Sequence, residues 1–154
     1  MGIFLKDINL KGKTALVTGA TKGIGRGTAV ALAQAGANII AIGRNQIQLD
    51  SLKKIILKLR VNYHSFNCDV NNYELLKEYI SKLKKLDILV NNAGTNIPEP
   101  FLNVKQSSME TILNVNTKAV FNVAQLCANK IIKLNKKNGS IINISSIFGI
   151  VAGQ

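Results

Sequence analysis

The sequence contains no tryptophan, one histidine, two cysteines and two prolines, and these scarcities narrow its possible functions. His64 has no carboxylate or cysteine arranged around it, so neither a metal site nor a Ser-His-Asp triad is supported. Cys68 and Cys127 lack the spacing of a metal or redox motif, and we interpret them as buried free thiols in a reducing, cytoplasmic setting. No apolar run reaches the roughly 20 residues of a membrane helix, and the first residues lack a secretory signal's apolar core.

Acidic residues are also few, since 8 Asp and Glu oppose 20 Lys and Arg and leave a formal charge of +12. Such a charge is compatible with nucleic acid, an acidic membrane or a phosphate-bearing ligand. Many of these cations fall late in expected helices, where they complement the negative end of the helix dipole. No basic run is interleaved with aromatic residues, as single-strand binders require. We therefore expect a solvated basic surface, with neither a nucleic-acid nor a membrane partner.

Short β-rich runs alternate with longer helical stretches along the chain. The expected strands are 14–18, 38–42, 63–66, 87–90 and 140–144, and the expected helices are 25–35, 46–60, 72–84 and 109–134. Apolar strands joined by amphipathic helices predict parallel pairing and right-handed crossovers. The sequence thus predicts one α/β domain over residues 1–154. It is a Rossmann-type doubly wound parallel sheet in a three-layer αβα arrangement, truncated after about the fifth strand.

A glycine-rich turn, TGATKGIG at 18–25, lies between the first expected strand and the first expected helix. Glycines let the backbone approach a pyrophosphate, and the following helix N-terminus presents free N–H groups. The spacing is G-x3-G-x-G rather than G-x-G-x-x-G. A P-loop is the rival motif, but Asp7 stands where its first glycine would precede 12–14. We predict a dinucleotide site that includes Gly19, Thr21, Lys22, Gly23, Ile24 and Gly25.

The end of the second expected strand bears on the choice of nicotinamide cofactor. A carboxylate there hydrogen-bonds the ribose of NAD, whereas a basic residue accommodates the 2′-phosphate of NADP. Here the sequence reads Gly43, Arg44, Asn45, with no acid until Asp50. Arg44 offers a bidentate fork to phosphate, and Lys22 can add a second cation. We predict that NADP(H) is favoured over NAD(H), the alternative being that both are ordinary surface cations.

Several motifs in a fixed order resemble the short-chain dehydrogenase/reductase family. Besides the glycine turn they are Asp69-Val70, NNAG at 91–94, NVN at 114–116 and ISS at 144–146. Residues 22–28, Arg44 and the run 49–52 resemble its NADP-dependent carbonyl reductase and L-xylulose reductase branch. The resemblance implies an oxidoreductase that transfers hydride between a nicotinamide and a small carbonyl compound or secondary alcohol.

The resemblance also assigns cofactor-binding roles. It gives Asp69 the adenine amino group, with the backbone of Val70 helping, although a helix N-cap is the alternative for Asp69. The segment with Asn91, Ala93 and Gly94 would line the cofactor with backbone, and Asn91 is as much structural as ligand-binding.

Two catalytic roles follow from the same resemblance. Asn116 would kink the long helix and hold a water in a proton relay, with a capping or core amide as the alternative. Asn114 points about 200° away on a helix, so both cannot face the site. Ser146 would orient the substrate carbonyl, and Ser145 replaces it if the register slips by one.

The family's catalytic Tyr-x-x-x-Lys pair is absent after Ser146, where eight residues remain. The resemblance implies a tyrosine that protonates the carbonyl oxygen and a lysine that lowers its pKa. Tyr73 and Lys77 fit the pattern, but they follow Asp69 on the adenine side of the fold. We therefore expect an N-terminal fragment with an apolar edge strand near its end and little turnover by itself.

The full-length form is expected to be a homodimer or homotetramer. A non-catalytic NADP(H)-binding module is the alternative function, and a basic nucleic-acid binder is a third hypothesis. The substrate's identity is not encoded in this stretch, because the residues that shape the family's substrate pocket fall largely outside it.

Overall fold

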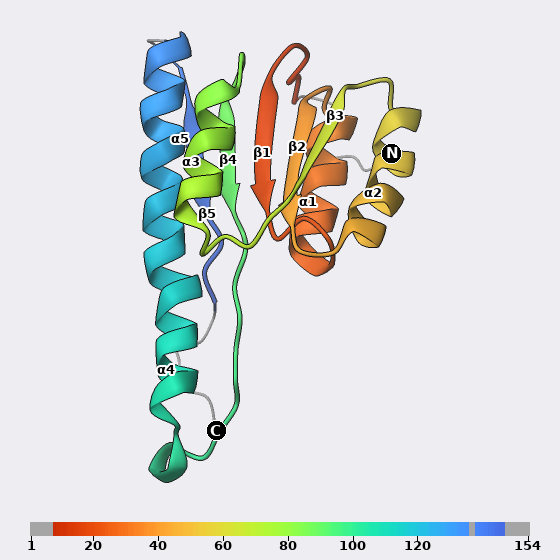
Figure 1. Cartoon of the computed structure of the whole chain (residues 1–154). Helices are drawn as coiled ribbons and strands as arrows, with labels where there is room; N and C mark the ends of the chain where they lie inside the picture. The colour runs from red at the N-terminus through yellow and green to blue at the C-terminus, as the bar shows by residue number, and fades with distance from the viewer. Residues whose placement is uncertain (1–7, 136–137, 147–154) are drawn as a thin grey trace.

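The computed structural model describes residues 8–135 and 138–146, and a parallel sheet runs through its centre (Figure 1). The strands are β1 (Thr14–Thr18), β2 (Asn38–Gly43), β3 (Tyr63–Asn67), β4 (Ile88–Asn91) and β5 (Ser140–Asn143). Their order is β3-β2-β1-β4-β5, and every neighbouring pair is parallel. The chain therefore builds outward from β1 in both directions, which confirms the predicted Rossmann-type fold.

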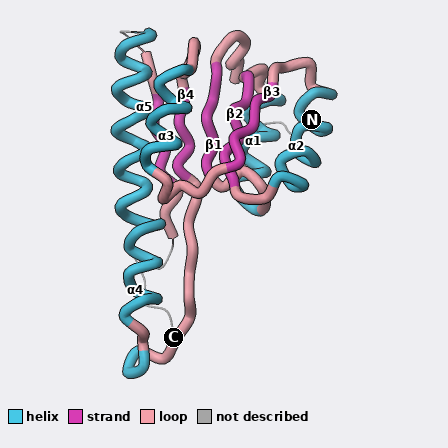
Figure 2. The backbone as a smooth tube through the Cα atoms, viewed as in Figure 1, coloured by secondary structure: helices cyan, strands magenta, loops and turns pink. Residues whose placement is uncertain are grey.

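Helices cover both faces of the sheet (Figures 1 and 2). One face carries α1 (Gly23–Gln34) and α2 (Gln46–Lys58), and the other carries α3 (Tyr73–Lys82) and α5 (Val120–Asn135). A shorter helix, α4 (Gln106–Leu113), runs into α5 through a π-helical segment, Asn114–Ala119. This rod projects past the carboxyl edge of the sheet, and a short 3-10 turn, Phe101–Asn103, precedes it (Figure 1).

Alternate side chains of β1 enter two separate cores. Ala15 and Val17 pack under α1 and α2, whereas Leu16 packs under α3 and α5. Leu16 lies level with Ile40 of β2 and Leu89 of β4, and both of these belong to the same core as Leu16. A parallel strand buried on both faces is apolar at most positions, which explains the nearly continuous apolar runs in the sequence.

Helix ends differ from the expected ones by a few residues. Helix α1 begins at Gly23 rather than at residue 25, because the extended backbone of Lys22 forms its N-cap. Helix α2 ends before Arg60, whose φ of 59° is left-handed. The N-cap of α3 is Asn72, whose side-chain oxygen accepts from the Leu75 N–H at 3.3 Å, so Asp69 does not cap this helix.

Strand β5 forms an apolar edge in the described part of the sheet, as expected. Its residues are exposed, and Ile141 and Ile142 keep 40% and 44% of their surface open. An edge strand of this kind carries unpaired backbone groups that favour association with another chain. Within residues 8–135 and 138–146, no helix combines the length and apolar character needed to cross a membrane.

The buried face of α2 provides a test of the fold. Leu52 is fully buried in the core beneath α1 and α2, so Leu52→Ala should lower the free energy of unfolding by about 2–5 kcal/mol. Ile47 lies on the same helix but is 81% exposed, and Ile47→Ala should change stability by less than about 0.5 kcal/mol. Urea denaturation followed by circular dichroism measures both, and equal losses would contradict this packing.

Candidate functional site

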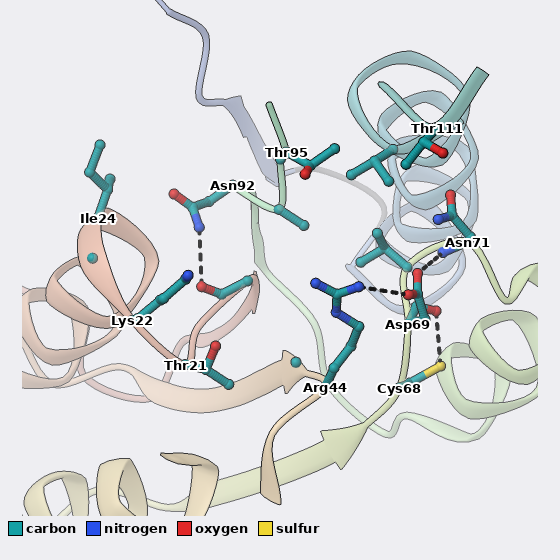
Figure 3. Close-up of a pocket in the computed structure, with 17 residues that line it drawn as sticks. Thr21, Lys22, Ile24, Arg44, Cys68, Asp69, Asn71, Asn92, Thr95 and Thr111 are labelled. Carbon is teal, nitrogen blue, oxygen red and sulfur yellow. Dashed lines mark hydrogen bonds and ion pairs between the residues drawn. The ribbon is translucent and has the colours of Figure 1, made fainter. Parts of the chain in front are cut away.

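A cavity of about 640 Å³ opens at the carboxyl edge of the sheet (Figure 3). The loops that follow β1, β2, β3 and β4 line it, together with Thr111 of α4 and Val115 of the π-helical segment. Strands β2 and β3 lie on one side of β1, and β4 and β5 lie on its other side, so the strand order reverses at β1. Open α/β sheets bind ligands where the strand order reverses in this way. The volume falls within the roughly 300–1,000 Å³ of small-molecule sites.

Most of the predicted cofactor residues line this cavity, namely Gly19, Thr21, Lys22, Gly23, Ile24, Arg44, Asp69, Val70, Ala93 and Gly94. Gly25 and Asn91 are not among the lining residues, and neither are Asn116 and Ser146. The lining also contains residues that were not predicted to bind the cofactor, namely Gly43, Cys68, Asn71, Asn92, Thr95, Thr111 and Val115.

The turn after β1 requires glycine at two positions of positive φ. Gly19 and Gly23 have φ of 62° and 54°, in the left-handed region that side chains disfavour. A Cβ on Gly19 would also lie 2.9 Å from the side-chain nitrogen of Asn92. Lys22 then enters α1 in an extended conformation, and no described side chain caps the helix. The first N–H groups of α1 are thus available to an anion at the positive end of the helix dipole.

A hydrogen-bonded clamp joins this turn to the segment after β4. The buried Thr18 hydroxyl oxygen accepts from the Asn92 and Ala93 N–H groups, both at 3.0 Å. In the opposite direction, the Asn92 side-chain amide donates to the carbonyl oxygens of Thr18 and Gly19 at 3.0 and 3.3 Å. Four hydrogen bonds therefore fix the two loops that form the floor of the cavity.

Gly25 and Asn91 lie outside the cavity lining, but they stabilise the segments that form it. A Cβ at Gly25 would collide with the Gly19 carbonyl oxygen and with the Asn92 amide, so glycine is required for α1 to approach the turn. Asn91 is buried, and its amide donates to the Val120 carbonyl and the Asn143 side-chain oxygen, both at 3.1 Å. It ties β4 to α5 and β5.

Charged groups of opposite sign stand at the rim of the cavity. The Arg44 guanidinium donates to Asp69 Oδ2 at 3.4 Å, and their side chains are 78% and 40% exposed (Figure 3). Asp69 Oδ1 accepts from the Asn71 N–H at 2.9 Å. The Lys22 side chain is exposed on the same cavity. The guanidinium of Arg44 is therefore paired with a carboxylate at the rim.

Cys68 contributes a protonated thiol to the wall. Burial raises the pKa of the Cys68 thiol, and the neighbouring Asp69 carboxylate raises it further. The thiol donates to the Asp69 carbonyl oxygen at 3.2 Å. Because the thiolate is the reactive form, this cysteine is a poor nucleophile at neutral pH. Burial also raises the pKa of Cys127 to about 12.

Asn116 lies in the π-helical segment and holds the loop after β4. Its side-chain oxygen accepts from the Thr95 N–H, and its nitrogen donates to the Thr95 carbonyl, both at 2.9 Å. Ser146 is exposed three residues beyond β5, whose pairing with β4 is extended by the Ile144 N–H bonding to the Asn91 carbonyl at 2.8 Å. The described residues contain no cluster of three or more His, Cys, Asp or Glu side chains suited to a metal ion.

Thr18 and Asn92 stand in the motifs at 18–25 and 91–94, but their side-chain roles in the clamp were not predicted. Thr18 follows three apolar residues of β1, and a buried polar side chain at the end of a strand indicates a hydrogen-bond partner. Asn92 follows Asn91, and successive side chains of an extended chain point to opposite sides. Since Asn91 is buried against β5, Asn92 faces the glycine turn.

Alanine substitutions of two glycines in α1 separate the effect of steric crowding from the effect of helix propensity. Gly25→Ala should weaken nucleotide binding by roughly tenfold or more and lower stability, because its Cβ would push apart the clamp. Gly27→Ala meets nothing within 4 Å and should leave binding unchanged while stabilising the helix by up to about 1 kcal/mol. Calorimetric titration with NADP⁺ and thermal denaturation test the pair. Similar behaviour of the two variants would refute the close approach at Gly25.

Comparison with known proteins agrees with this geometry. The family model for short chain dehydrogenase matches residues 13–154. A 3-oxoacyl-[acyl-carrier-protein] reductase from Thermotoga maritima is 37% identical over 93% of this chain and 59% of its own length. An L-xylulose reductase from Mesocricetus auratus is 39% identical over 91% of this chain and 55% of its own. The chain thus spans a little over half the length of these curated relatives.

Two solved structures superpose on the same fold with different cofactors. An Agrobacterium tumefaciens protein described as a 2-deoxy-D-gluconate 3-dehydrogenase, with bound NADP, has a TM-score of 0.85 and 31% identity over 96% of this chain and 58% of its own. Carveol dehydrogenase from Mycobacterium avium, in complex with NAD, has a TM-score of 0.88 and 26% identity over 94% and 58%. The fold, the site and these matches together show that the chain belongs to the short-chain dehydrogenase family.

Proposed function

We propose that this cavity binds NADP(H) in preference to NAD(H). The observation that carries the proposal is an uncapped, glycine-lined helix N-terminus with Lys22 and Arg44 at its rim. The N–H groups of the turn suit a diphosphate, and Arg44 suits a 2′-phosphate because its guanidinium presents a planar fork. The two superposed structures carry different cofactors, so the preference rests on the residues of this chain.

The adenine end is proposed to lie between β3 and α4. Asp69 presents a carboxylate oxygen to the cavity and can accept from the adenine amino group. Val70 and Val115 supply apolar surface for the ring. Asn91, in contrast, is proposed to act as a structural residue, because its buried amide is already bonded to α5 and β5.

The whole protein is proposed to transfer hydride between the bound nicotinamide and a carbonyl or secondary alcohol. The nicotinamide supplies or accepts the hydride when bound. Asn116 would support the site from the long helix, where its two bonds to Thr95 fix the loop after β4. Ser146, or Ser145 if the register slips, would orient the substrate oxygen. A non-catalytic NADP(H)-binding module is the second candidate, because binding needs only the residues that line the cavity.

The protein's setting is part of the same proposal. We place it in the cytoplasm, where the buried free thiols of Cys68 and Cys127 stay reduced. A full-length homodimer or homotetramer is supported by large apolar side chains on the long helical rod, where Phe121 is 64% exposed and Ile132 is 66% exposed.

Cofactor preference can be measured directly on the 154-residue chain. Calorimetric titration should show tighter binding of NADP⁺ than of NAD⁺. Arg44→Met should weaken NADP⁺ binding by roughly tenfold or more, because a charge-assisted bond is lost, and should change NAD⁺ binding little. Lys53→Met, which removes an exposed cation of α2, serves as the control. Equal affinity for the two nucleotides would refute the proposed preference. Binding of neither nucleotide would refute the proposed nucleotide site itself.

Turnover separates the oxidoreductase from the binding module. The 154-residue chain should bind NADPH yet oxidise it no faster than the background rate in the presence of small ketones, aldoses or acyl thioesters. The expected reason is the lack of a tyrosine acid beside Ser146. A spectrophotometric assay at 340 nm measures this, beside a form extended at its C-terminus by its natural sequence. Robust reduction by the 154-residue chain would refute the need for a Tyr-x-x-x-Lys pair.

A further inference from the structure

Two groups assigned to opposite ends of the adenosine site form an ion pair with each other. Arg44 is the candidate partner of a 2′-phosphate, and Asp69 is the candidate partner of the adenine amino group. The structure joins them by an ion pair of 3.4 Å between Arg44 Nη1 and Asp69 Oδ2 (Figure 3). A nucleotide whose 2′-phosphate binds Arg44 must therefore first break this ion pair.

The carboxylate is the fixed partner of this pair. Asp69 Oδ1 is held by the Asn71 N–H at 2.9 Å, and the Asp69 carbonyl accepts from the Cys68 thiol. Only Oδ2 faces Arg44. Exchange of partners at Asp69 therefore takes place at Oδ2 and leaves the loop after β3 in place.

The backbone of Arg44 is equally fixed, whereas its side chain is not. The Gly43 carbonyl accepts from the Cys68 N–H at 3.0 Å. With its amide oriented to satisfy its neighbours, Asn67 donates to the Gly43 and Arg44 carbonyls, both at 3.2 Å. The Arg44 side chain is nevertheless 78% exposed. The guanidinium can thus move between Asp69 and a ligand without any movement of β2.

We propose that Asp69 determines cofactor selectivity by competing with the 2′-phosphate for the Arg44 guanidinium. This inference rests on the proposed NADP(H) site. A 2′-phosphate takes Arg44 from Asp69, and the adenine amino group can donate to Oδ2 whether or not Arg44 is bound there, because a carboxylate oxygen accepts more than one hydrogen bond. A nucleotide without that phosphate leaves the ion pair in place. Asp69 therefore weakens the discrimination that Arg44 provides, while its own contact with adenine serves both cofactors equally.

The substitution Asp69→Asn isolates this effect. Asparagine keeps the shape and the oxygen that accepts from Asn71, but it removes the charge that holds Arg44. Adenosine 2′,5′-bisphosphate and adenosine 5′-monophosphate differ only in the 2′-phosphate, so the ratio of their dissociation constants cancels any change at the adenine ring. We expect the variant to raise the preference for the bisphosphate by roughly two- to five-fold, the range that an exposed ion pair allows.

Calorimetric titration of both probes into the 154-residue chain, at fixed ionic strength, tests the proposal. In an Arg44→Met background, Asp69→Asn should leave the ratio unchanged, because the competition acts through Arg44. Glu78→Gln removes another exposed carboxylate, paired with Lys82 on α3 away from the cavity lining, and should also leave it unchanged. Circular dichroism verifies that each variant folds.

The outcomes separate this inference from the proposed site. If the parent chain binds neither probe, the nucleotide site itself is wrong. If both probes bind and Asp69→Asn leaves the ratio unaltered, the competition does not exist. A ratio that falls would show that Asp69 orients Arg44 toward the phosphate, which also overturns the proposal. An equal rise in the Arg44→Met background would assign the effect to charge alone and overturn it as well.

Discussion

The close approach of the turn after β1 to the loop after β4 is the constraint on which the site depends. Two backbone N–H groups share the buried Thr18 hydroxyl oxygen, and the Asn92 amide bonds two carbonyls of the turn. This contact is possible because Gly19 and Gly25 carry no Cβ where Asn92 and the turn meet. A buried N–H left without a partner costs roughly 1–3 kcal/mol, so the clamp holds the floor of the cavity in one arrangement.

The rim of the cavity has the opposite character. Arg44 and Lys22 extend into solvent from backbone that is fixed by the strands and by the turn. Preorganised backbone N–H groups need little reordering to receive an anion, whereas a long side chain loses rotamer freedom when it binds. A rigid floor therefore suits the diphosphate that both cofactors share, and the flexible cations suit the group that distinguishes them.

The sequence predicted the architecture because the information for it is local. Strands buried on both faces are nearly continuous apolar runs, and the glycine turn stands between one such run and a helix, so the fold and most of the cavity lining follow. Contacts between distant segments are not encoded in this way. Nothing near Arg44 in sequence indicates that its guanidinium meets Asp69, 25 residues away. Similarly, only the tertiary structure shows that Asn92 faces the glycine turn, while Asn91 is buried against β5.

The net charge of +12 and the two rim cations act over different distances. Exposed charges more than about 8–10 Å from a ligand are largely screened at physiological ionic strength. The lysines spread over the helices therefore do not distinguish one nucleotide from another. Discrimination needs a directed bond at a fixed position, and Arg44 is the cation at the end of β2 that can form one with its planar fork. Because that cation is bonded to Asp69, the proposed selectivity depends on a difference between two ion pairs rather than on positive charge as such.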